Sequence, residues 1–341
     1  MGKNKTQRLW QLAMLLLLVA GAVYVVRKGK TQPAWHKEAG EVFGTYFHVT
    51  YECDTSILSG IQAEMDRVDA SLSPFNPTSV ISRVNRNEDV RPDSLFTRVF
   101  CLAQEVSRRT DGAFDITVAP LVNAWGFGFK NGSTITPQLI DSLMQHVGYN
   151  KVRLEGGRVV KEDSCVMLDC SAVAKGYGSD CVAAFLESNG IRNYMIEIGG
   201  EIVLKGHNEH GEPWRVGITK PIDDSLAVNN ELNDIIHATS LAVATSGNYR
   251  NFYYKDGHKY AHTIDPRTGQ PVQHNILSST VVAPDCATAD AYATAFMVVG
   301  LEQAREILAR TPEIEAYFIY ADENDSNRVF MTKGMEKLLD D

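Results

Sequence analysis

The sequence has little positive charge outside its first thirty residues. Six of its 33 Lys and Arg residues lie in that segment, which contains no acid, so 27 basic residues stand against 42 acidic ones in the rest, a net charge of −15. No basic stripe interrupts this acidic remainder, and a surface of that sign repels nucleic acid. It also repels an anionic nucleotide, so a phosphate ligand would need a metal ion or backbone N–H groups to bind.

Cysteine pairs with metal-site spacing are also absent. The chain has no C-x-x-C motif and no paired histidines near a cysteine, so the spacing typical of a zinc site is missing. In an oxidising compartment some of the cysteines could pair, but the sequence gives no connectivity. The simplest interpretation is that they are buried thiols packing as small hydrophobic groups: Cys53, Cys101, Cys165, Cys170, Cys181 and Cys286.

Three common functional fingerprints are missing as well. The sequence contains neither the dinucleotide motif G-x-G-x-x-G nor a P-loop, and it has no G-x-S-x-G nucleophile elbow. Gly126-Phe127-Gly128 and Lys175-Gly176-Tyr177-Gly178 are glycine-rich but match none of these motifs. No internal repeat is visible. These absences argue against a dinucleotide-binding Rossmann domain, a P-loop NTPase and a serine hydrolase of the elbow type.

Long hydrophobic runs are lacking, apart from one at the N-terminus. The uncharged run at residues 9–26 lies between two basic clusters, and its 18 residues are close to the minimum of about 17 for a spanning helix. Ala20-Gly21-Ala22 is similar to a signal-peptide cleavage site, so a cleaved signal remains the alternative to an uncleaved anchor. We predict an anchor or signal at residues 1–30, a linker at 31–40 and a folded extracytoplasmic domain at 41–341.

The remaining sequence interleaves helical and strand-like patterns. Helical spacing is seen near residues 57–68, 92–109, 172–188 and from 288 onwards. Strand-like patterns fall at residues 46–51, 166–169, 194–198, 201–204, 214–219, 242–245, 251–254 and 279–282, with a hairpin at 152–160. Because no regular βαβ period emerges, we predict an α+β fold with mixed or antiparallel sheets and packed helices.

Two places carry residues suited to a phosphate ligand. Lys175 lies near the start of the helix predicted at 172–188, where free N–H groups and a cation suit a diphosphate. Asp290 and Thr294 are four residues apart on a predicted helix, so both side chains project from one face. A carboxylate and a hydroxyl are hard oxygen donors of the kind Mg²⁺ prefers, although the same spacing is common in helices without a metal.

A further candidate is His262, which stands close to Asp265 in a turn-forming segment. Pro266 and Gly269 delimit the turn, so we expect His262 and Asp265 to lie beside each other at the end of a strand. A histidine with a pKa near neutrality can act as a general base. A structural histidine is the alternative at this point.

Taken in order, these segments resemble the ApbE family of FAD:protein FMN transferases over roughly residues 40–335. The resemblance lies in eight blocks: GTYF at 44–47, SLSPFN at 71–76, TDGAFDIT at 110–117 continuing to PLVNAWGFG at 120–128, LDCSAVAKGY at 168–177, GGE at 199–201, ATSGNY at 244–249, HTIDPRTG at 262–269 and ADAYAT at 289–294. Eight blocks in the family's order make coincidence implausible.

The resemblance implies a fold and a set of site residues. The fold would be an α+β body with a T-fold-like core, and FAD would lie in a cleft with its diphosphate bridged by Mg²⁺. The metal ligands would be the backbone oxygen of Ala172 and the side chains of Asp290 and Thr294. His262 and Asp265 would be the catalytic candidates, with His262 as base or orienting group for the acceptor hydroxyl. FAD contacts would come from Phe43, Phe75, Ala113, Phe114, Asp115, Asp169, Lys175 and Ile264, although the family often has Met and Tyr in place of Phe43 and Phe75.

The implied reaction transfers FMN from FAD to a threonine hydroxyl of an acceptor protein, with release of AMP. Acceptors in the family belong to membrane redox complexes such as sodium-pumping NADH:quinone reductase and Rnf-type complexes. We therefore expect an enzyme anchored in the inner membrane with its catalytic domain in the periplasm. Two alternatives stay open: an FAD pyrophosphatase, in which water replaces the threonine, and a flavin-binding protein without catalysis.

Overall fold

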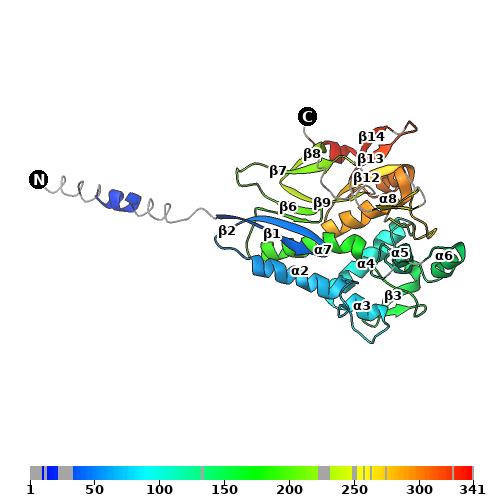
Figure 1. Ribbon diagram of the computed structural model, residues 1–341. Coiled ribbons are helices and arrows are strands. Elements are labelled where there is room, and N and C mark those ends of the chain that lie inside the picture. The colour runs from blue at the N-terminus through cyan, green and yellow to red at the C-terminus, as the bar shows by residue number, and fades with distance from the viewer. Residues whose placement is uncertain are drawn as a thin grey trace, which may run out of the picture.

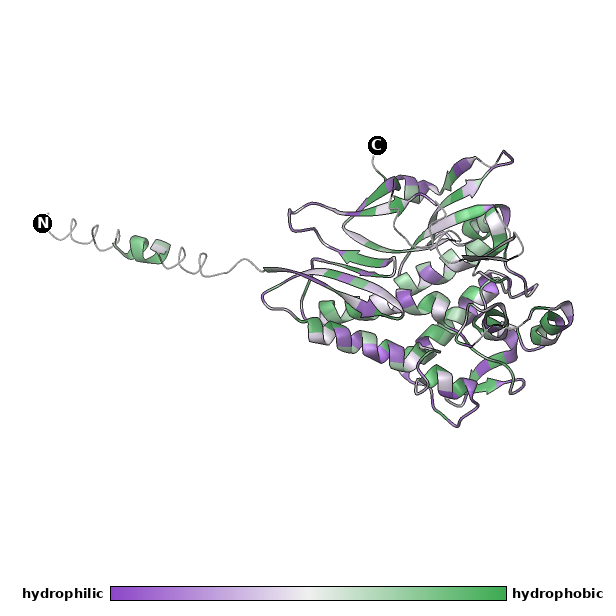
Figure 2. Ribbon diagram, viewed as in Figure 1, coloured by the Kyte–Doolittle hydropathy of each residue, from purple (hydrophilic) through white to green (hydrophobic). Residues whose placement is uncertain are grey.

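The computed structural model describes residues 10, 14–21, 34–130, 132, 134–221, 231–247, 252–255, 258–261, 263–272, 275–324 and 326–339. Residues 14–21 are helical and strongly hydrophobic (Figure 2). Within the described ranges no helix is long and apolar enough to cross a membrane. Half of the run at 9–26 lies outside those ranges, so the anchor remains a prediction.

The centre of the fold is an eight-stranded sheet in which every neighbouring pair is antiparallel. This agrees with the predicted α+β class. The spatial order of the strands is β1 (Ala34–Val42), β2 (Thr45–Cys53), β5 (Tyr194–Ile198), β6 (Glu201–Lys205), β9 (Ser240–Gly247), β12 (Ile276–Ala283), β13 (Glu315–Ala321) and β14 (Asn327–Met331).

Helices cover one face of this sheet in two tiers (Figure 1). The tier next to the sheet is α7 (Ser171–Ser188), which contacts β5 and β6, and α8 (Cys286–Ala309), which contacts β9 and β12. The outer tier is α2 (Leu58–Leu72), packed on α7, and α4 (Ser94–Arg109), packed on both inner helices. The smaller helices are α3 (Val80–Asn85), α5 (Ala119–Trp125), α6 (Pro137–Met144), α9 (Lys333–Glu336) and the 3₁₀ turns η1 (Ile116–Val118) and η2 (Tyr149–Lys151).

Three two-stranded ribbons complete the fold. The ribbon of β7 (Trp214–Thr219) and β8 (Leu232–Ala238) covers the other face of the sheet, where Trp214 and Val216 share a core with Val243 and Tyr317. The other two ribbons are β3 (Val152–Glu155) with β4 (Arg158–Lys161), and β10 (Phe252–Lys255) with β11 (His258–Ala261). The sheet is therefore buried on both faces over its centre.

The predicted linker at 31–40 is too long. Residues 34–40 belong to β1, which pairs with β2 along its whole length from Ala34↔Cys53 to Val42↔Thr45. None of its nine residues is fully buried, because β1 is an edge strand, so it has no apolar alternation for sequence analysis to detect.

The strand predicted at 166–169 is also wrong. The backbone of Leu168 is paired with a side chain: its N–H donates to Asn85 Oδ1 at 2.7 Å, and its carbonyl accepts from Asn85 Nδ2 at 2.8 Å. Asp169 N–H donates to the carbonyl of Ile116 at 2.7 Å. These bonds satisfy an extended buried segment without a neighbouring strand.

Candidate functional site

A cavity of about 1070 Å³ opens between the central sheet, the N-terminal part of α7 and the middle of α8. The hairpin turn at Phe43, the loop around Phe75, the segment at 113–116 and strand β7 also line it. Pockets for drug-sized ligands have volumes of roughly 300–1,000 Å³, so this cavity has room for a ligand as large as a dinucleotide.

Most of the residues predicted from the sequence meet in this cavity. Eleven of the thirteen line it: Phe43, Phe75, Ala113, Phe114, Asp115, Asp169, Ala172, Lys175, Ile264, Asp290 and Thr294. His262 lies outside the described residues, so its position is not assigned. Asp265 is described and is treated below.

At the floor of the cavity a lysine lies between two buried carboxylates. Lys175 Nζ is 3.3 Å from Glu201 Oε1 and 3.8 Å from Asp290 Oδ2, and the two acids are only 3% and 2% exposed. Burial raises the pKa of Glu201 to about 8, with Lys175 opposing and Asp290 adding to the rise. Burial also raises the pKa of Asp290. Burial alone would lower the pKa of Lys175, but the two neighbouring carboxylates outweigh it and hold that pKa above its ordinary value.

Glu201 has an unused acceptor at this point. Its Oε2 is buried and finds no hydrogen-bond donor among the residues that the structure describes. A buried carboxylate oxygen without a partner is costly, so such a group indicates a site for a cation or another donor. The centre therefore carries more acceptor capacity than Lys175 alone satisfies.

A close approach of α7 and α8 brings this centre together. A Cβ added at Gly176 would lie 2.3 Å from the carbonyl oxygen of Cys286 and 2.9 Å from Asp290 Cβ, so only glycine fits between the helices. The N–H of Gly176 donates to Asp290 Oδ2 at 3.1 Å. In a regular helix this N–H would be directed to the carbonyl of Ala172, so its donation to Asp290 leaves the Ala172 oxygen with acceptor capacity.

The donors around Asp290 fit a hard divalent cation. The Asp290 carboxylate, the Thr294 hydroxyl and the Ala172 carbonyl all line the cavity, and Thr294 Oγ1 is 3.3 Å from Ser246 Oγ. These are oxygen ligands of the kind that bind Mg²⁺ together with waters and substrate phosphates. The unpartnered Oε2 of Glu201 is a further oxygen donor close to the same place. The residues present thus fit the metal that the sequence analysis expects.

Two further acids, both predicted FAD contacts, also line the cavity. Asp115 Oδ1 accepts hydrogen bonds from the N–H and the hydroxyl of Thr117, both at 2.7 Å, and burial raises the pKa of Asp115 to about 6. Asp169 Oδ1 accepts from Ser171 N–H at 2.8 Å at the start of α7, and burial raises its pKa as well. In both acids one carboxylate oxygen is held by the local turn.

The two aromatic candidates stand at the mouth of the cavity. Phe43 occupies the two-residue turn between β1 and β2 with φ of 52°, a backbone conformation that is uncommon for a residue with a side chain. Its ring lies against Gly178, where an added Cβ would be 2.7 Å away. Phe75 is 65% exposed and packs edge-on against Phe129 at 6.2 Å. Both rings are placed where a flat ligand could stack on them.

Asp265 is not among the residues that line the cavity, and its predicted place beside His262 stays a prediction because His262 is outside the described residues. Its carboxylate accepts a bidentate pair from Arg267, with Nε–Oδ1 and Nη2–Oδ2 both 3.0 Å, and Oδ1 also accepts the N–H of Arg267 at 2.8 Å. Its carbonyl accepts from the N–H groups of Thr268 and Gly269. This geometry makes Asp265 an organising residue of the turn.

Sequence reasoning assigned no role to Glu201 or Ser246, both of which line the cavity. Each lies within one of the blocks that carry the family resemblance, GGE at 199–201 and ATSGNY at 244–249. The sequence did contain a signal for Glu201. It is a charged residue at the first position of a buried strand, directly after a Gly-Gly pair, and a buried carboxylate needs a partner.

Together the antiparallel α+β body and the cavity define a class of protein that holds a large ligand against a carboxylate-rich cation site. The chain belongs to the ApbE family, whose sequence profile matches residues 43–318.

Known relatives agree with this membership. The chain is 37% identical over 302 residues to the FAD:protein FMN transferase of Vibrio cholerae serotype O1, covering 85% of this chain and 89% of that one. It is 32% identical over 343 residues to the FAD:protein FMN transferase of Escherichia coli K12, covering 95% and 96%. The solved flavin transferase ApbE from Vibrio cholerae superposes with a TM-score of 0.81 at 33% identity, covering 90% of this chain and all of that one.

Proposed function

We propose that this protein is an FAD:protein FMN transferase. The observation that carries the proposal is the meeting of Lys175, Asp290 and Thr294 in one large cavity, in a chain 37% identical to a protein of that name. The transfer joins FMN to a threonine hydroxyl of an acceptor protein and releases AMP. The threonine oxygen forms a bond to the phosphorus on the FMN side of the diphosphate, and the bond from that phosphorus to the AMP oxygen breaks.

Each wall of the cavity has a part in binding FAD. The rings of Phe43 and Phe75 would stack on the isoalloxazine at the mouth, and the segment Ala113, Phe114, Asp115 with Ile264 would enclose it. Lys175 would pair with the diphosphate, which lets an acidic protein accept an anionic ligand.

A magnesium ion fits the donors on α7 and α8. The Asp290 carboxylate, the Thr294 hydroxyl and the Ala172 carbonyl would hold it, and when bound it would neutralise charge on the diphosphate. The chain's own groups fix the geometry, since Gly176 holds Asp290 in place through its N–H. His262 is the proposed base or orienting group for the acceptor hydroxyl, on the sequence motif alone.

We extend the proposal to location and partners. The apolar run at 9–26 supports an N-terminal membrane anchor with the catalytic domain on the periplasmic side. An enzyme held there would meet threonine-bearing subunits of membrane redox complexes, such as sodium-pumping NADH:quinone reductase or Rnf-type complexes. A chain lacking residues 1–30 should modify such a subunit less in cells than the full chain; equal modification would contradict the role of the anchor.

The reaction is tested by incubating the full chain with FAD, Mg²⁺ and a threonine-bearing acceptor subunit, and weighing the acceptor by mass spectrometry. We expect the acceptor to gain the mass of an FMN phosphoester, AMP to appear in equal amount, and a chelator to block both. The acceptor with its target threonine replaced by alanine is the matched control. Release of AMP and free FMN without a modified acceptor would favour the pyrophosphatase, and FAD left intact would favour a flavin-binding protein.

A further inference from the structure

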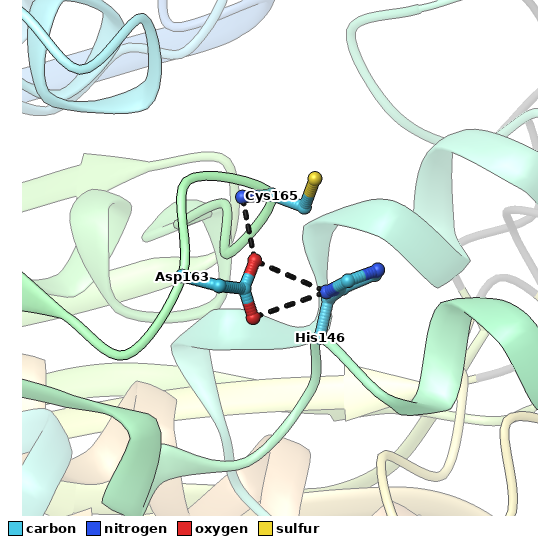
Figure 3. A group of neighbouring side chains, drawn as sticks. All are labelled: His146, Asp163 and Cys165. Carbon is cyan, nitrogen blue, oxygen red and sulfur yellow. Dashed lines mark hydrogen bonds and ion pairs between the residues drawn. The ribbon is translucent and has the colours of Figure 1, made fainter.

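A second group of possible metal ligands lies outside the lining of the flavin cavity, in the segments after α6 and β4. His146 follows α6, whereas Asp163 and Cys165 follow β4, so two separate segments contribute. One ligand atom from each residue lies within 4.8 Å of the other two. Figure 3 shows the Asp163 carboxylate between the imidazole of His146 and the backbone N–H of Cys165. None of the three belongs to the described lining of the cavity.

Local hydrogen bonds hold this group in place. His146 Nδ1 is 3.1 Å from Asp163 Oδ1 and 3.2 Å from Oδ2. Cys165 N–H donates to Asp163 Oδ1 at 2.7 Å, which closes a tight turn and fixes the backbone of Cys165 two residues from the carboxylate. On the other segment, His146 N–H donates to the carbonyl of Leu143 at 2.9 Å. Both segments are therefore ordered by their own backbone bonds.

The spacing matches a tetrahedral zinc site after a small movement of one side chain. With Zn–N of about 2.0–2.1 Å and Zn–O of about 2.0–2.2 Å, a tetrahedral angle separates the nitrogen and oxygen by roughly 3.4 Å, near the 3.1 and 3.2 Å found here. A Zn–S bond of about 2.3 Å places the sulfur roughly 3.6 Å from the nitrogen. The thiol lies within 4.8 Å of the other two ligand atoms, and because Cys165 is exposed, its side chain has room to rotate toward them.

We propose that His146, Asp163 and Cys165 form a Zn²⁺ site with an open fourth position for water. An imidazole nitrogen, a carboxylate oxygen and a thiolate form a mixed donor set that suits Zn²⁺ rather than Mg²⁺ or Ca²⁺, which prefer oxygen ligands. Binding releases the thiol proton, because a thiolate is the ligand. The spacing rules failed to find this site because its histidine comes from a different segment, 17 residues before Asp163.

The position of the site suggests what the ion would stabilise. It would join the loop after α6 to the loop that runs from Cys165 to Asp169 in the flavin cavity. On the other side, Ile140 and Met144 of α6 pack against Gly269 of the Asp265 turn. A bound ion would therefore restrain the loop to Asp169, which reaches the cavity, and the end of α6, which packs against the Asp265 turn. The proposal concerns metal binding and does not depend on flavin transfer.

The test uses Co²⁺ as a spectroscopic substitute for Zn²⁺ in the full chain, freed of metal by chelation and kept reduced without added thiols. We expect one equivalent of Co²⁺ to produce a near-ultraviolet thiolate-to-cobalt charge-transfer band, which one equivalent of Zn²⁺ removes. Such a band cannot come from the oxygen donors around Asp290, so it reports on the thiol site. Zn²⁺ should also raise the melting temperature of the wild-type chain.

Three variants decide which residues are ligands. Cys165→Ser and His146→Ala should lose the band and weaken Zn²⁺ binding by at least about tenfold, since even outer-shell changes cost 10–100-fold. Cys101→Ser is the matched control, because Cys101 is the other exposed free thiol, and it should keep the band. Circular dichroism confirms that each variant is folded. Absence of the band in the wild-type chain, or a band that survives in Cys165→Ser, would overturn the proposal.

Discussion

Asp290 is the residue whose charge the proposed cation site needs most directly. It is buried, it accepts a hydrogen bond from Gly176, and it lies 3.8 Å from Lys175. Asp290→Asn keeps the shape and the acceptor for Gly176 but removes the charge that would hold a cation. We expect FMN transfer at fixed Mg²⁺ to fall by about 100-fold or more, in line with the loss of a single preorganised electrostatic group.

The change can be separated from a folding defect. Asp141→Asn makes the same substitution at an exposed position on α6 and should leave turnover unchanged. The two variants are compared by FMN transfer at increasing Mg²⁺ and by thermal melting. Asp290→Asn with wild-type activity and wild-type Mg²⁺ dependence would show that the cation is held elsewhere.

Asp265 provides a second prediction, because its partner is a single arginine. Asp265→Asn and Arg267→Met should each lower the free energy of unfolding by about 1.5–3 kcal/mol, the range for hydrogen bonds to charged groups. Since both break the same bidentate pair, the double variant should lose clearly less than the sum of the two single losses. Urea unfolding gives the three values. If Asp265→Asn removes turnover while Arg267→Met retains it, Asp265 acts on the substrate and the structural interpretation fails.

These residues show how far sequence could locate the site. The four-residue spacing of Asp290 and Thr294 predicted that their side chains share one face of a helix, and both line the cavity. The direction of the Asp265 side chain was not predictable, because Arg267 competes with any ligand for its carboxylate. The unpartnered oxygen of Glu201 likewise depends on burial, which only the assembled fold reveals.

At the scale of elements, the crossing of α7 and α8 is the contact that positions the site. Gly176→Ala would place a methyl group 2.3 Å from the carbonyl oxygen of Cys286, which is backbone and cannot rotate away. We expect the helices to separate, with a loss of about 1–3 kcal/mol in stability, the usual cost of overpacking a core. The Gly176–Asp290 hydrogen bond should break as well, so Mg²⁺-dependent transfer should fall even in the folded fraction.

Gly178→Ala is the matched comparison for this change. Its added methyl group meets the ring of Phe43, a side chain at the mouth of the cavity that can shift. We expect a smaller loss of stability in denaturant unfolding, together with a weaker affinity for FAD. Equal stability losses in the two variants would mean that the helix crossing tolerates extra volume, contrary to the packing described.

Helices and strands that bury an apolar face were predicted from the sequence more accurately than those that do not. Helix α7 and strands β5 and β6 follow apolar patterns that the predictions located to within a residue. Strand β1 was assigned to a linker because its pairing with β2 comes from backbone bonds and not from buried side chains. The segment at 166–169 has a strand-like sequence, yet the side chain of Asn85, more than 80 residues away, takes the place of a neighbouring strand. Long-range partners of this kind leave no local signal.

At the scale of the whole molecule, acidic residues outnumber basic ones, and the charged residues buried in the described part of the chain are all acids. The sequence predicted that any anionic ligand must be neutralised locally, and the cavity concentrates Lys175 and the cation donors in one place. What composition could not predict is that several acids are buried with raised pKa values. Because the folded chain keeps protons on these groups that the unfolded chain releases, they make the free energy of unfolding fall as pH rises. Surface carboxylates in ion pairs have the opposite effect.

Asp180 provides the clearest test of this dependence. Its carboxylate accepts the N–H groups of Cys286 and Ala287 at 2.9 Å each, and burial raises its pKa from 3.8 to about 7. Between pH 4 and pH 7 the folded chain therefore holds a proton at Asp180 that the unfolded chain has lost. Since the folded state binds more protons, the contribution of Asp180 to stability is present at low pH and is lost as pH rises through about 7.

The slope of stability against pH measures this proton. Asp180→Asn cannot titrate, so between pH 5 and pH 6.5 it should make the decline of unfolding free energy with pH shallower by about 1.4 kcal/mol per pH unit, the value of one proton. Urea unfolding at several pH values without divalent cations gives the slope, independently of any constant loss of stability from the amide. Asp141→Asn should retain the wild-type slope. An unchanged slope in Asp180→Asn would mean that the two backbone N–H groups keep Asp180 ionised, and that the N-terminus of α8 stabilises a half-buried charge.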